Sequence, residues 1–353
     1  MKRAESILIP FGAIAAGMIV FGIFCALAGA NPLLVYASLW KAGFGSWYSW
    51  QNTLVRASPL LLCGLCTSLP ARAGIIVIGN EGALVVGGLG AISAGLATLS
   101  MPPWFCLVTM GIAAMLCGGL WIAFSVALQH YRGVSAVISG LLLNYLAIAF
   151  MNQLIEGPLR DPSSLNNPAT YPLTPDHRLA YFSGTHVHHG ILFGVIACLI
   201  AWILVDRTTF GFSLKISGGN VRTAQLVGLP VGKLVVIAGF LGGACAGLAG
   251  MIEVAAVHGR GNESLNAGYG YVGILVAFLS RQSPLGVLVV SVMVGGLLAS
   301  GGMLQRAHDL PDATITVLQG ILFLFILLSD TVYGRFRTRA HINSGVKANA
   351  VAV

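Results

Sequence analysis

The sequence contains little charge. Asp, Glu, Lys and Arg make up 8% of its 353 residues, against about 25% in ordinary soluble domains. Hydrophobic residues make up 56%, and apolar runs of roughly 20 residues recur, each long enough to cross a bilayer as a helix. An ordinary soluble fold is therefore excluded, and the sequence predicts an all-α integral membrane protein.

The sequence also lacks the motifs of common catalytic and nucleotide-binding sites. Its one Gly-Lys pair, Gly232-Lys233, is followed by Leu234, so no P-loop is present, and neither an HExxH zinc motif nor a nucleophile elbow occurs. The residues from Gly268 to Gly273 match GxGxxG, but no strand precedes them, and we interpret the match as accidental. We therefore expect no enzyme activity, no cofactor and no ATP hydrolysis by this chain alone.

Cysteine chemistry is not indicated either. All seven cysteines fall within apolar segments, and the pair Cys63 and Cys66 lacks both a βαβ context and a second pair that would complete a metal site. We interpret both as small side chains packed in a helix.

The apolar runs fit about ten transmembrane helices. With the N-terminus in the cytoplasm, 13 Lys and Arg residues lie inside and 6 outside, as the positive-inside rule requires, and both termini are cytoplasmic. The net charge of +8 is spread over short loops, so a nucleic-acid partner is not expected. The N-terminal run is interpreted as a retained helix, with a cleaved signal peptide as the alternative. The predicted spans are 7–29, 52–71, 74–98, 103–128, 134–155, 188–205, 234–253, 269–280, 284–303 and 313–331.

Residues 1–333 thus form a transmembrane domain, and 334–353 a polar cytoplasmic tail, predicted to be disordered. The external loop 156–187 contains five prolines and is predicted to be an ordered cap or docking surface. At its end, His186, His188 and His189 together with His177 are either polar loop residues, the interpretation we favour, or metal ligands.

The internal loop 206–233 contains a short helical pattern. Asn220 is suited to cap its N-terminus and Gly228 to end it. This piece is either a connector or a lever on which another protein pushes.

Glu81 is an acidic residue in an apolar run. It lies nine residues after Arg72, which places it about 13 Å along a helix, near the bilayer midplane. Its neighbours Gly79 and Gly82 allow a helix to break there, and Gly268, Gly270 and Gly273 mark a second break in the other half of the chain. Paired glycine-interrupted helices indicate a midplane pathway formed by two inverted-topology halves.

Asn80 and Asn144 add buried polar groups at similar depth, so the candidate substrate-pathway residues are Asn80, Glu81 and Asn144. For Glu81 three roles stay open: satisfying backbone amides freed by the break, lining the pathway directly, and coupling transport to protons. Elsewhere, Gly239, Gly243 and Gly247 form a small-xxx-small ridge that predicts close helix packing.

Several segments match a known family. The element Arg72, Gly74, Ile78, Gly79, Glu81 and Gly82 precedes the element Gly133, Val134, Val137, Ile138, Leu143, Asn144 and Tyr145. The internal loop contains Gly218, Asn220, Ala224 and Gly228, followed by GACAGLAGMIEV, GYGYVGILVAFLSRQSPLG and LQGILF. Over residues 50–330 the chain resembles the membrane permeases of bacterial ABC importers of the branched-chain amino acid and simple sugar group, most closely the nucleoside-type permeases.

The resemblance implies three protein partners within the lipid of a bacterial cytoplasmic membrane: a second permease, a cytoplasmic ATPase that uses the ATP, and an extracytoplasmic substrate-binding protein. Gly218, Asn220, Ala224 and Gly228 would then belong to the coupling helix that contacts the ATPase, and the loop 156–187 would face the binding protein. The implied cargo is a nucleoside, with a simple sugar as the alternative. An ion-coupled secondary transporter is a more distant alternative. Val77 and Ala83 replace two amide residues of the family pattern, which affects the choice of cargo and not the class of transporter.

Overall fold

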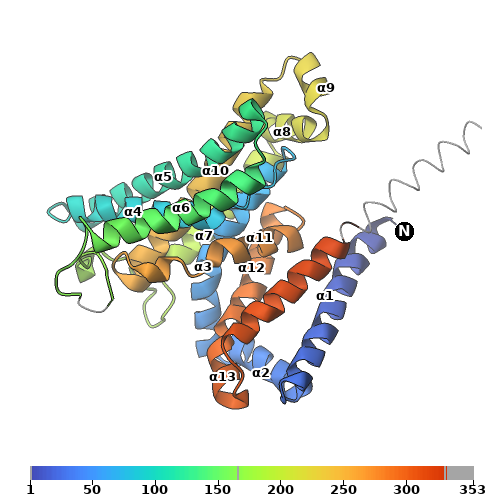
Figure 1. Ribbon diagram of the computed structural model, residues 1–353, viewed down its shortest axis with the longest axis vertical. Helices are drawn as coiled ribbons and strands as arrows, with labels where there is room; N and C mark the ends of the chain where they lie inside the picture. The colour runs from blue at the N-terminus through green and yellow to red at the C-terminus, as the bar shows by residue number, and fades with distance from the viewer. Residues whose placement is uncertain (1, 165–166, 330, 332–353) are drawn as a thin grey trace, which may run out of the picture. The chain divides into compact units, whose positions relative to one another are not determined.

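The computed structural model describes residues 2–164, 167–329 and 331 (Figure 1), so the predicted disordered tail, 334–353, lies outside the described residues. Helices dominate the described part of the chain. Two compact units can be separated, one formed by residues 42–299 and the other by the two ends of the chain, 1–41 and 300–353. Each unit is described by itself below.

The terminal unit contains α1 (Lys2–Leu27), most of α2 (Pro32–Phe44), α13 (Gly301–His308) and a last helix, Ala313–Ser329. Gly17 of α1 lies against Leu322 of the last helix, where an added Cβ would be 3.0 Å from the leucine Cδ2. The Tyr36 hydroxyl of α2 donates to the Met18 carbonyl of α1. None of the predicted spans covers α2, which lies between the first two, 7–29 and 52–71.

The larger unit contains the other helices. They are α3 (Trp47–Ala71), α4 (Asn80–Ala97), α5 (Pro103–Arg132), α6 (Ala136–Glu156), α7 (Gly190–Asp206), α8 (Thr209–Gly219), α9 (Val221–Leu226), α10 (Val231–Ile252), α11 (Tyr269–Leu279) and α12 (Pro284–Ala299). Three short helical turns complete it: η1 (Pro175–His177), the π-helix η2 (Glu253–His258) and η3 (Glu263–Leu265).

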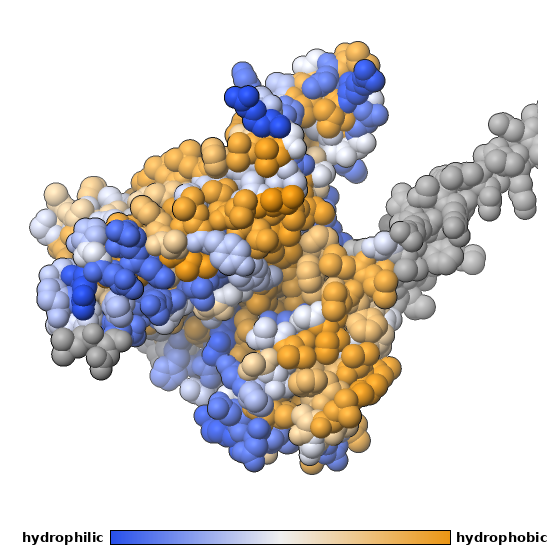
Figure 2. Space-filling view, viewed as in Figure 1, coloured by the Kyte–Doolittle hydropathy of each residue, from blue (hydrophilic) through white to orange (hydrophobic). Residues whose placement is uncertain are grey.

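Within the described residues, six helices are long and apolar enough to cross a membrane, or up to eight if each of two bent helix pairs is one span. The first pair bends by 114° between Gly12–Leu27 and Pro32–Phe44, and the second by 69° between Gly190–Asp206 and Thr209–Gly219. Of the ten predicted spans, the eighth and tenth correspond to α11 and Ala313–Ser329, which are shorter than a full span. Figure 2 shows apolar side chains over the middle of the larger unit and polar side chains near α8 and α9.

Glycines bring the helices of the larger unit into close contact. Lipid tails are as apolar as the helices themselves, so close packing replaces hydrophobic burial as the force between them. A Cβ added to Gly247 of α10 would lie 2.0 Å from the Ala114 carbonyl oxygen of α5, and one added to Gly243 would lie 2.3 Å from the Gly118 carbonyl oxygen. The predicted glycine ridge on α10 is therefore confirmed as a close contact between two helix backbones.

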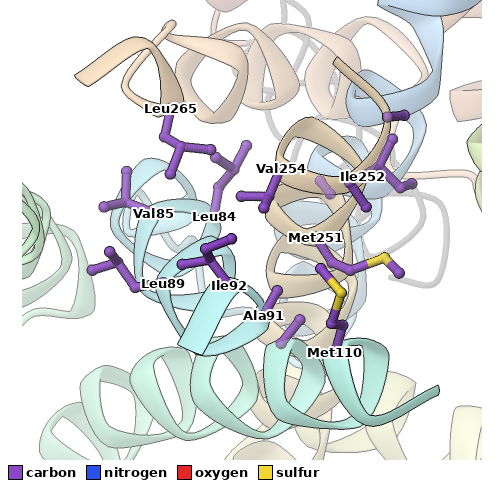
Figure 3. Close-up of a cluster of buried hydrophobic side chains, with 14 of the residues drawn as sticks. Leu84, Val85, Leu89, Ala91, Ile92, Met110, Met251, Ile252, Val254 and Leu265 are labelled. Atoms are coloured by element: carbon purple, nitrogen blue, oxygen red, sulfur yellow. The ribbon is translucent and has the colours of Figure 1, made fainter. Parts of the chain in front are cut away.

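Around this contact lies a fully buried apolar cluster (Figure 3). It joins Leu84, Leu89 and Ile92 of α4 to Met110 of α5 and to the end of α10. Cys63 and Cys66 are free thiols buried inside α3, in agreement with the packing role predicted for them.

Candidate functional site

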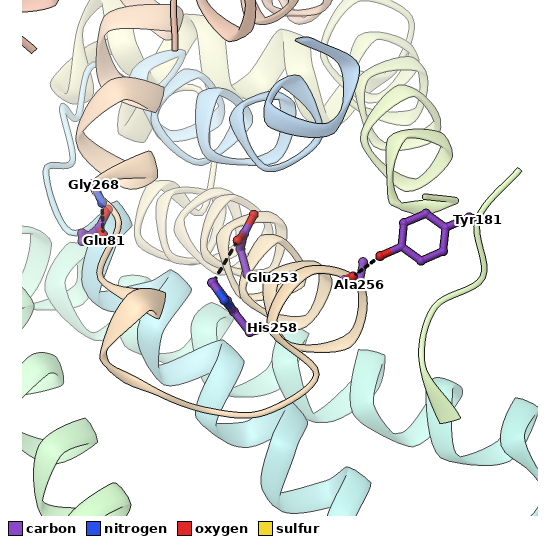
Figure 4. A network of polar contacts seen from close by, with 6 residues as sticks. All are labelled: Glu81, Tyr181, Glu253, Ala256, His258 and Gly268. Carbon is purple, nitrogen blue, oxygen red and sulfur yellow. Dashed lines mark hydrogen bonds and ion pairs between the residues drawn. The ribbon is translucent and has the colours of Figure 1, made fainter. Parts of the chain in front are cut away.

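Glu81 lies in the first turn of α4 and is completely buried. Its two carboxylate oxygens accept hydrogen bonds from amides at the start of α11. Oε1 accepts from the N-cap residue Gly268 at 2.8 Å (Figure 4), and Oε2 accepts from Gly270 N at 2.6 Å. Helix N-termini carry unpaired N–H groups and a partial positive charge. The carboxylate is thus placed where the backbone of α11 stabilises a negative charge.

Glycine is required on the α11 side of this contact. Gly268, the N-cap, has φ of +82°, a conformation that residues with a Cβ avoid. A Cβ on Gly270 would lie 2.3 Å from Glu81 N, and one on Gly273 would lie 2.5 Å from the Cys63 Cβ. The starts of α4 and α11 therefore meet backbone to backbone, more closely than any side chain would permit.

The chain before Glu81 is not helical, in contrast to the depth count made from the sequence. Residues 75–79 have no regular secondary structure, with φ of −82° and ψ of 12° at Gly79, and α4 begins only at Asn80. A count at the helical rise per residue from Arg72 therefore does not apply to this segment. Gly79 is the N-cap residue of α4, whereas Gly82 belongs to its first turn.

Asn144 of α6 connects this non-helical segment to α4. Its Oδ1 accepts from Gly82 N at 2.8 Å, and its Nδ2 donates to the Ile78 carbonyl oxygen at 2.9 Å. The Nδ2 group also donates to the Tyr271 hydroxyl oxygen of α11 at 3.3 Å. A single buried amide thereby joins three separate segments.

Asn80 provides the remaining connection, to α3. Its Nδ2 donates to Thr67 Oγ1 at 2.7 Å and to the Cys63 carbonyl oxygen at 3.2 Å. The three side chains singled out from the sequence, Asn80, Glu81 and Asn144, thus come together, and all are fully buried. We call these three residues, with Gly268 and Gly270, the α4–α11 junction.

Sequence reasoning missed a second charged group at the end of α10. Glu253, which is 3% exposed, lies 3.5 Å from His258 Nε2 within the π-helix (Figure 4). The same signal that drew attention to Glu81, an acid within an apolar run, was available for Glu253. Tyr271 and Thr67 were also missed, because their roles depend on partners far away in the sequence.

The loop between α6 and α7 is attached to the π-helix and to the chain that follows it. Leu179 N donates to the Ala255 carbonyl oxygen at 3.0 Å, and the Tyr181 hydroxyl donates to that of Ala256 at 2.7 Å (Figure 4). Thr170 N donates to the Gly261 carbonyl oxygen at 2.9 Å. Residues 259–268 then lead directly to the junction, so the loop is connected to it through a short piece of chain.

The loop histidines occupy separate positions. His177 is bonded to Thr174 and to the Met101 carbonyl, whereas His188 Nδ1 accepts from Gly190 N at 3.1 Å. His186 is exposed. Among the residues that the structure describes, no group of three or more His, Cys, Asp or Glu side chains is arranged to hold a metal ion.

His188 makes a pH-dependent contribution to stability. Burial, with a smaller effect of His189, lowers the pKa of His188 from 6.5 to about 4. Between pH 6.5 and about 4, His188 is protonated in the unfolded chain and neutral in the folded chain. The free energy of unfolding therefore falls as the pH drops through this range, by up to about 3 kcal/mol. Thermal unfolding in detergent as a function of pH measures this loss. His188→Asn, which keeps an acceptor for Gly190 N, should reduce it, whereas His186→Asn at an exposed site should not; equal pH profiles for all three proteins would contradict this role.

The predicted helix in the internal loop is present as α9. Asn220 is its N-cap, with Oδ1 accepting from the amides of Arg222 and Thr223, and Gly228 follows it with φ of +82°. Both local predictions are confirmed. Leu226 and Val227 at its end are 85% and 72% exposed, and Ala224 is buried beneath them.

Gly218, at the end of α8, contacts the turn that leads to the junction. A Cβ there would lie 2.5 Å from the Arg72 carbonyl oxygen, and Gly74, opposite it, has φ of +78°. The internal loop therefore packs against residues 72–74, from which the non-helical segment 75–79 runs to the start of α4.

Comparison with known proteins gives a consistent result. Residues 49–327 match the family described as the branched-chain amino acid transport system / permease component. A glucose ABC transporter permease of Haloferax volcanii is 28% identical, over 93% of this chain and 88% of its own. Two guanosine ABC transporter permeases of Bacillus subtilis also match: NupP is 29% identical over 94% of this chain and 96% of its own, and NupQ is 24% identical over 78% and 89%.

Proposed function

Because this chain belongs to the permease-component family of branched-chain amino acid transport systems and is a non-catalytic membrane subunit of an ABC importer, we propose that its cargo is a nucleoside. The structural observation that supports movement of this subunit by a partner is α9, a capped helix of six residues with an exposed apolar end. Such a feature suits a subunit that is moved by another protein. The guanosine permeases among its relatives support the choice of cargo.

The partners follow from the same proposal. A cytoplasmic ATPase would receive Leu226 and Val227, and an extracytoplasmic binding protein would dock on the loop between α6 and α7. NupP and NupQ are two permeases of one organism and both resemble this chain, which supports pairing with a second permease. The chain would lie in a bacterial cytoplasmic membrane with both termini inside.

For the membrane domain we propose ten spans in two inverted halves, in which α4 and α11 are the paired broken helices. Each begins after non-helical chain, at 75–79 and at 266–268 respectively, and their N-termini meet at Glu81. Irregular backbone at membrane depth is tolerated where it is buried in protein or lines an aqueous cavity. This arrangement is typical of the midplane sites of transporters.

In the proposed mechanism, Asn80, Glu81 and Asn144 hold the two broken helices together beside the pathway. Their complete burial and their bonds to backbone groups support this positioning role. ATP binding by the partner would move α9 and α8, and Gly218 would transmit that movement to residues 72–74. The non-helical segment 75–79 would then shift the junction.

Uptake by the assembled importer tests the function. Proteoliposomes containing this chain, the second permease and the ATPase, supplied with the binding protein, should take up labelled guanosine only when ATP is present. Uptake of glucose and not of guanosine would replace the nucleoside by a sugar. Guanosine uptake driven by a proton gradient without ATP would contradict the importer mechanism.

Removing the cap of α9 should weaken coupling. Asn220→Ala deletes two hydrogen bonds at the helix start, which costs about 1 kcal/mol and lowers the ratio of helical to unfolded α9 about fivefold. Guanosine uptake should fall severalfold, with unchanged permease levels because α9 lies at the edge of the unit. Asn220→Asp keeps an N-cap acceptor and serves as the matched control; full uptake by Asn220→Ala would contradict a coupling role.

A further inference from the structure

Two tyrosines interrupt otherwise apolar exposed surfaces next to the α4–α11 junction. Tyr145 of α6 is 64% exposed, and Tyr271 of α11 is 40% exposed. In α11, every residue of which the structure describes, Tyr271 alone is exposed. The other large hydrophobic side chains exposed on α6 are Val137, Ile138, Leu141, Leu142, Leu146 and Phe150, and the exposed polar residues Gln153 and Glu156 lie in its last turn.

The depth of these phenols separates them from ordinary interfacial anchors. Tyrosines in membrane proteins gather at the two lipid–water interfaces. Tyr145 is near the middle of α6, a helix of 21 residues, which is about 31 Å long. Tyr271 lies in the first turn of α11, next to the amides that bind Glu81. A hydroxyl at this depth in hydrocarbon is costly unless it is hydrogen-bonded, so these groups are suited to a polar pathway.

Asn144 fixes the orientation of the Tyr271 hydroxyl. The Asn144 amide must direct Oδ1 toward Gly82 N and Nδ2 toward the Ile78 carbonyl oxygen. The group that faces the Tyr271 hydroxyl is therefore Nδ2, which is a donor. The Tyr271 oxygen is therefore the acceptor, and its proton remains to be donated to another group. Tyr145 directly follows Asn144 on α6, and Asn144 Nδ2 lies 3.3 Å from the Tyr271 hydroxyl oxygen, so the two tyrosines belong to helices that meet at this hydrogen bond.

We propose that Tyr145 and Tyr271 form a cargo-binding wall of the pathway and bind the nucleobase, with their rings against its flat face and the Tyr271 hydroxyl donating to its edge. This inference rests on the proposed function, since it assigns the part of a nucleoside that the pathway recognises. An aromatic ring stacks on every base, and such stacking tolerates changes of sequence or substituent. Asn144, bound to α4 and α11, keeps the wall rigid while the cargo passes.

Photolabelling with an azido-substituted guanosine tests the wall directly. In the assembled wild-type importer, the label should attach to peptides of α6 and α11. In the double variant Tyr145→Leu/Tyr271→Leu, labelling and guanosine uptake should both fall by about 5- to 150-fold, which corresponds to the loss of base stacking. Tyr145→Phe and Tyr271→Phe keep the rings and should retain most of the labelling.

Phe150→Leu is the matched control, an exposed aromatic on the same helix at 49% exposure, and it should change neither readout. Co-purification of the second permease and basal ATPase activity report assembly in every variant. Label confined to other helices, or full guanosine uptake by the double leucine variant, would overturn the proposal. The double leucine variant could also fail to assemble while the wild-type protein takes no label on α6 or α11. That pair of results would place the tyrosines in a contact between subunits and would also overturn the proposal. Wild-type uptake of glucose without guanosine would refute the proposed cargo, independently of where the label attaches.

Discussion

The substitution Glu81→Leu is expected to abolish guanosine uptake and to leave little folded permease in the membrane. It removes the acceptors of two backbone amides, that of the buried Gly270 and that of the partly buried Gly268. Hydrogen bonds to charged groups contribute about 1.5–3 kcal/mol each, so the expected loss is about 3–6 kcal/mol. Folded permease is measured by size-exclusion chromatography in detergent, and uptake in proteoliposomes.

Two further substitutions separate the charge of Glu81 from its position. Glu81→Gln keeps one acceptor oxygen and turns an NH₂ group toward the other amide, so an intermediate loss is expected. Glu263→Gln changes an exposed acid near the start of α11 and should have no effect. Normal folding and uptake of Glu81→Leu would contradict the positioning role that we assign to the carboxylate.

Gly247→Ala is expected to produce the second large effect, a marked fall in thermal stability. The added methyl group would lie 2.0 Å from the Ala114 carbonyl oxygen, and the glycine also faces Gly87 of α4. Backbone on both sides cannot move as a flexible side chain would. The cost therefore lies at or above the upper end of the about 1–3 kcal/mol usual for overpacking.

A glycine of α5 gives the matched control for this substitution. A Cβ on Gly111 would meet no atom within 4 Å. Gly111→Ala should therefore preserve or slightly raise the melting temperature, because alanine favours the helix by up to about 1 kcal/mol. Equal melting temperatures for Gly247→Ala and Gly111→Ala would show that the ridge is not a limiting contact.

Local signals in the sequence were sufficient for α9. An N-cap acts within three residues and a terminal glycine within one turn, so Asn220 and Gly228 carry the information for their own helix. The membrane class and the close packing at Gly247 were likewise predictable. Both follow from composition and spacing alone.

Features set by distant partners were not predictable in the same way. Hydropathy cannot distinguish the non-helical segment 75–79 from the first turns of a membrane helix, because its residues are equally apolar. The partner that binds the Ile78 carbonyl oxygen of this segment, Asn144, lies 66 residues away in the sequence. The bend before α2 and the carboxylate partners of Gly268 and Gly270 depend on tertiary contacts in the same way.

The π-helix illustrates this limit further. Its carbonyl groups at Ala255 and Ala256 are occupied by Leu179 N and the Tyr181 hydroxyl, which come from a loop that precedes α7. A wider helical turn is stabilised there by partners that no local pattern reveals. Glu253 and His258 face each other across the same six residues.

That attachment also sets an order of events during synthesis. Thr170 and Gly261, which exchange hydrogen bonds, are separated by 91 residues, and a ribosome needs roughly 5–20 s to translate such a stretch. Until α10 and the residues directly after it are in place, the loop between α6 and α7 lacks its hydrogen-bond acceptors. Its amides at Thr170, Leu173 and Leu179 are then open to solvent and to proteases. Any delay in the insertion of α10 therefore lengthens the time for which the nascent chain can be cut at this loop.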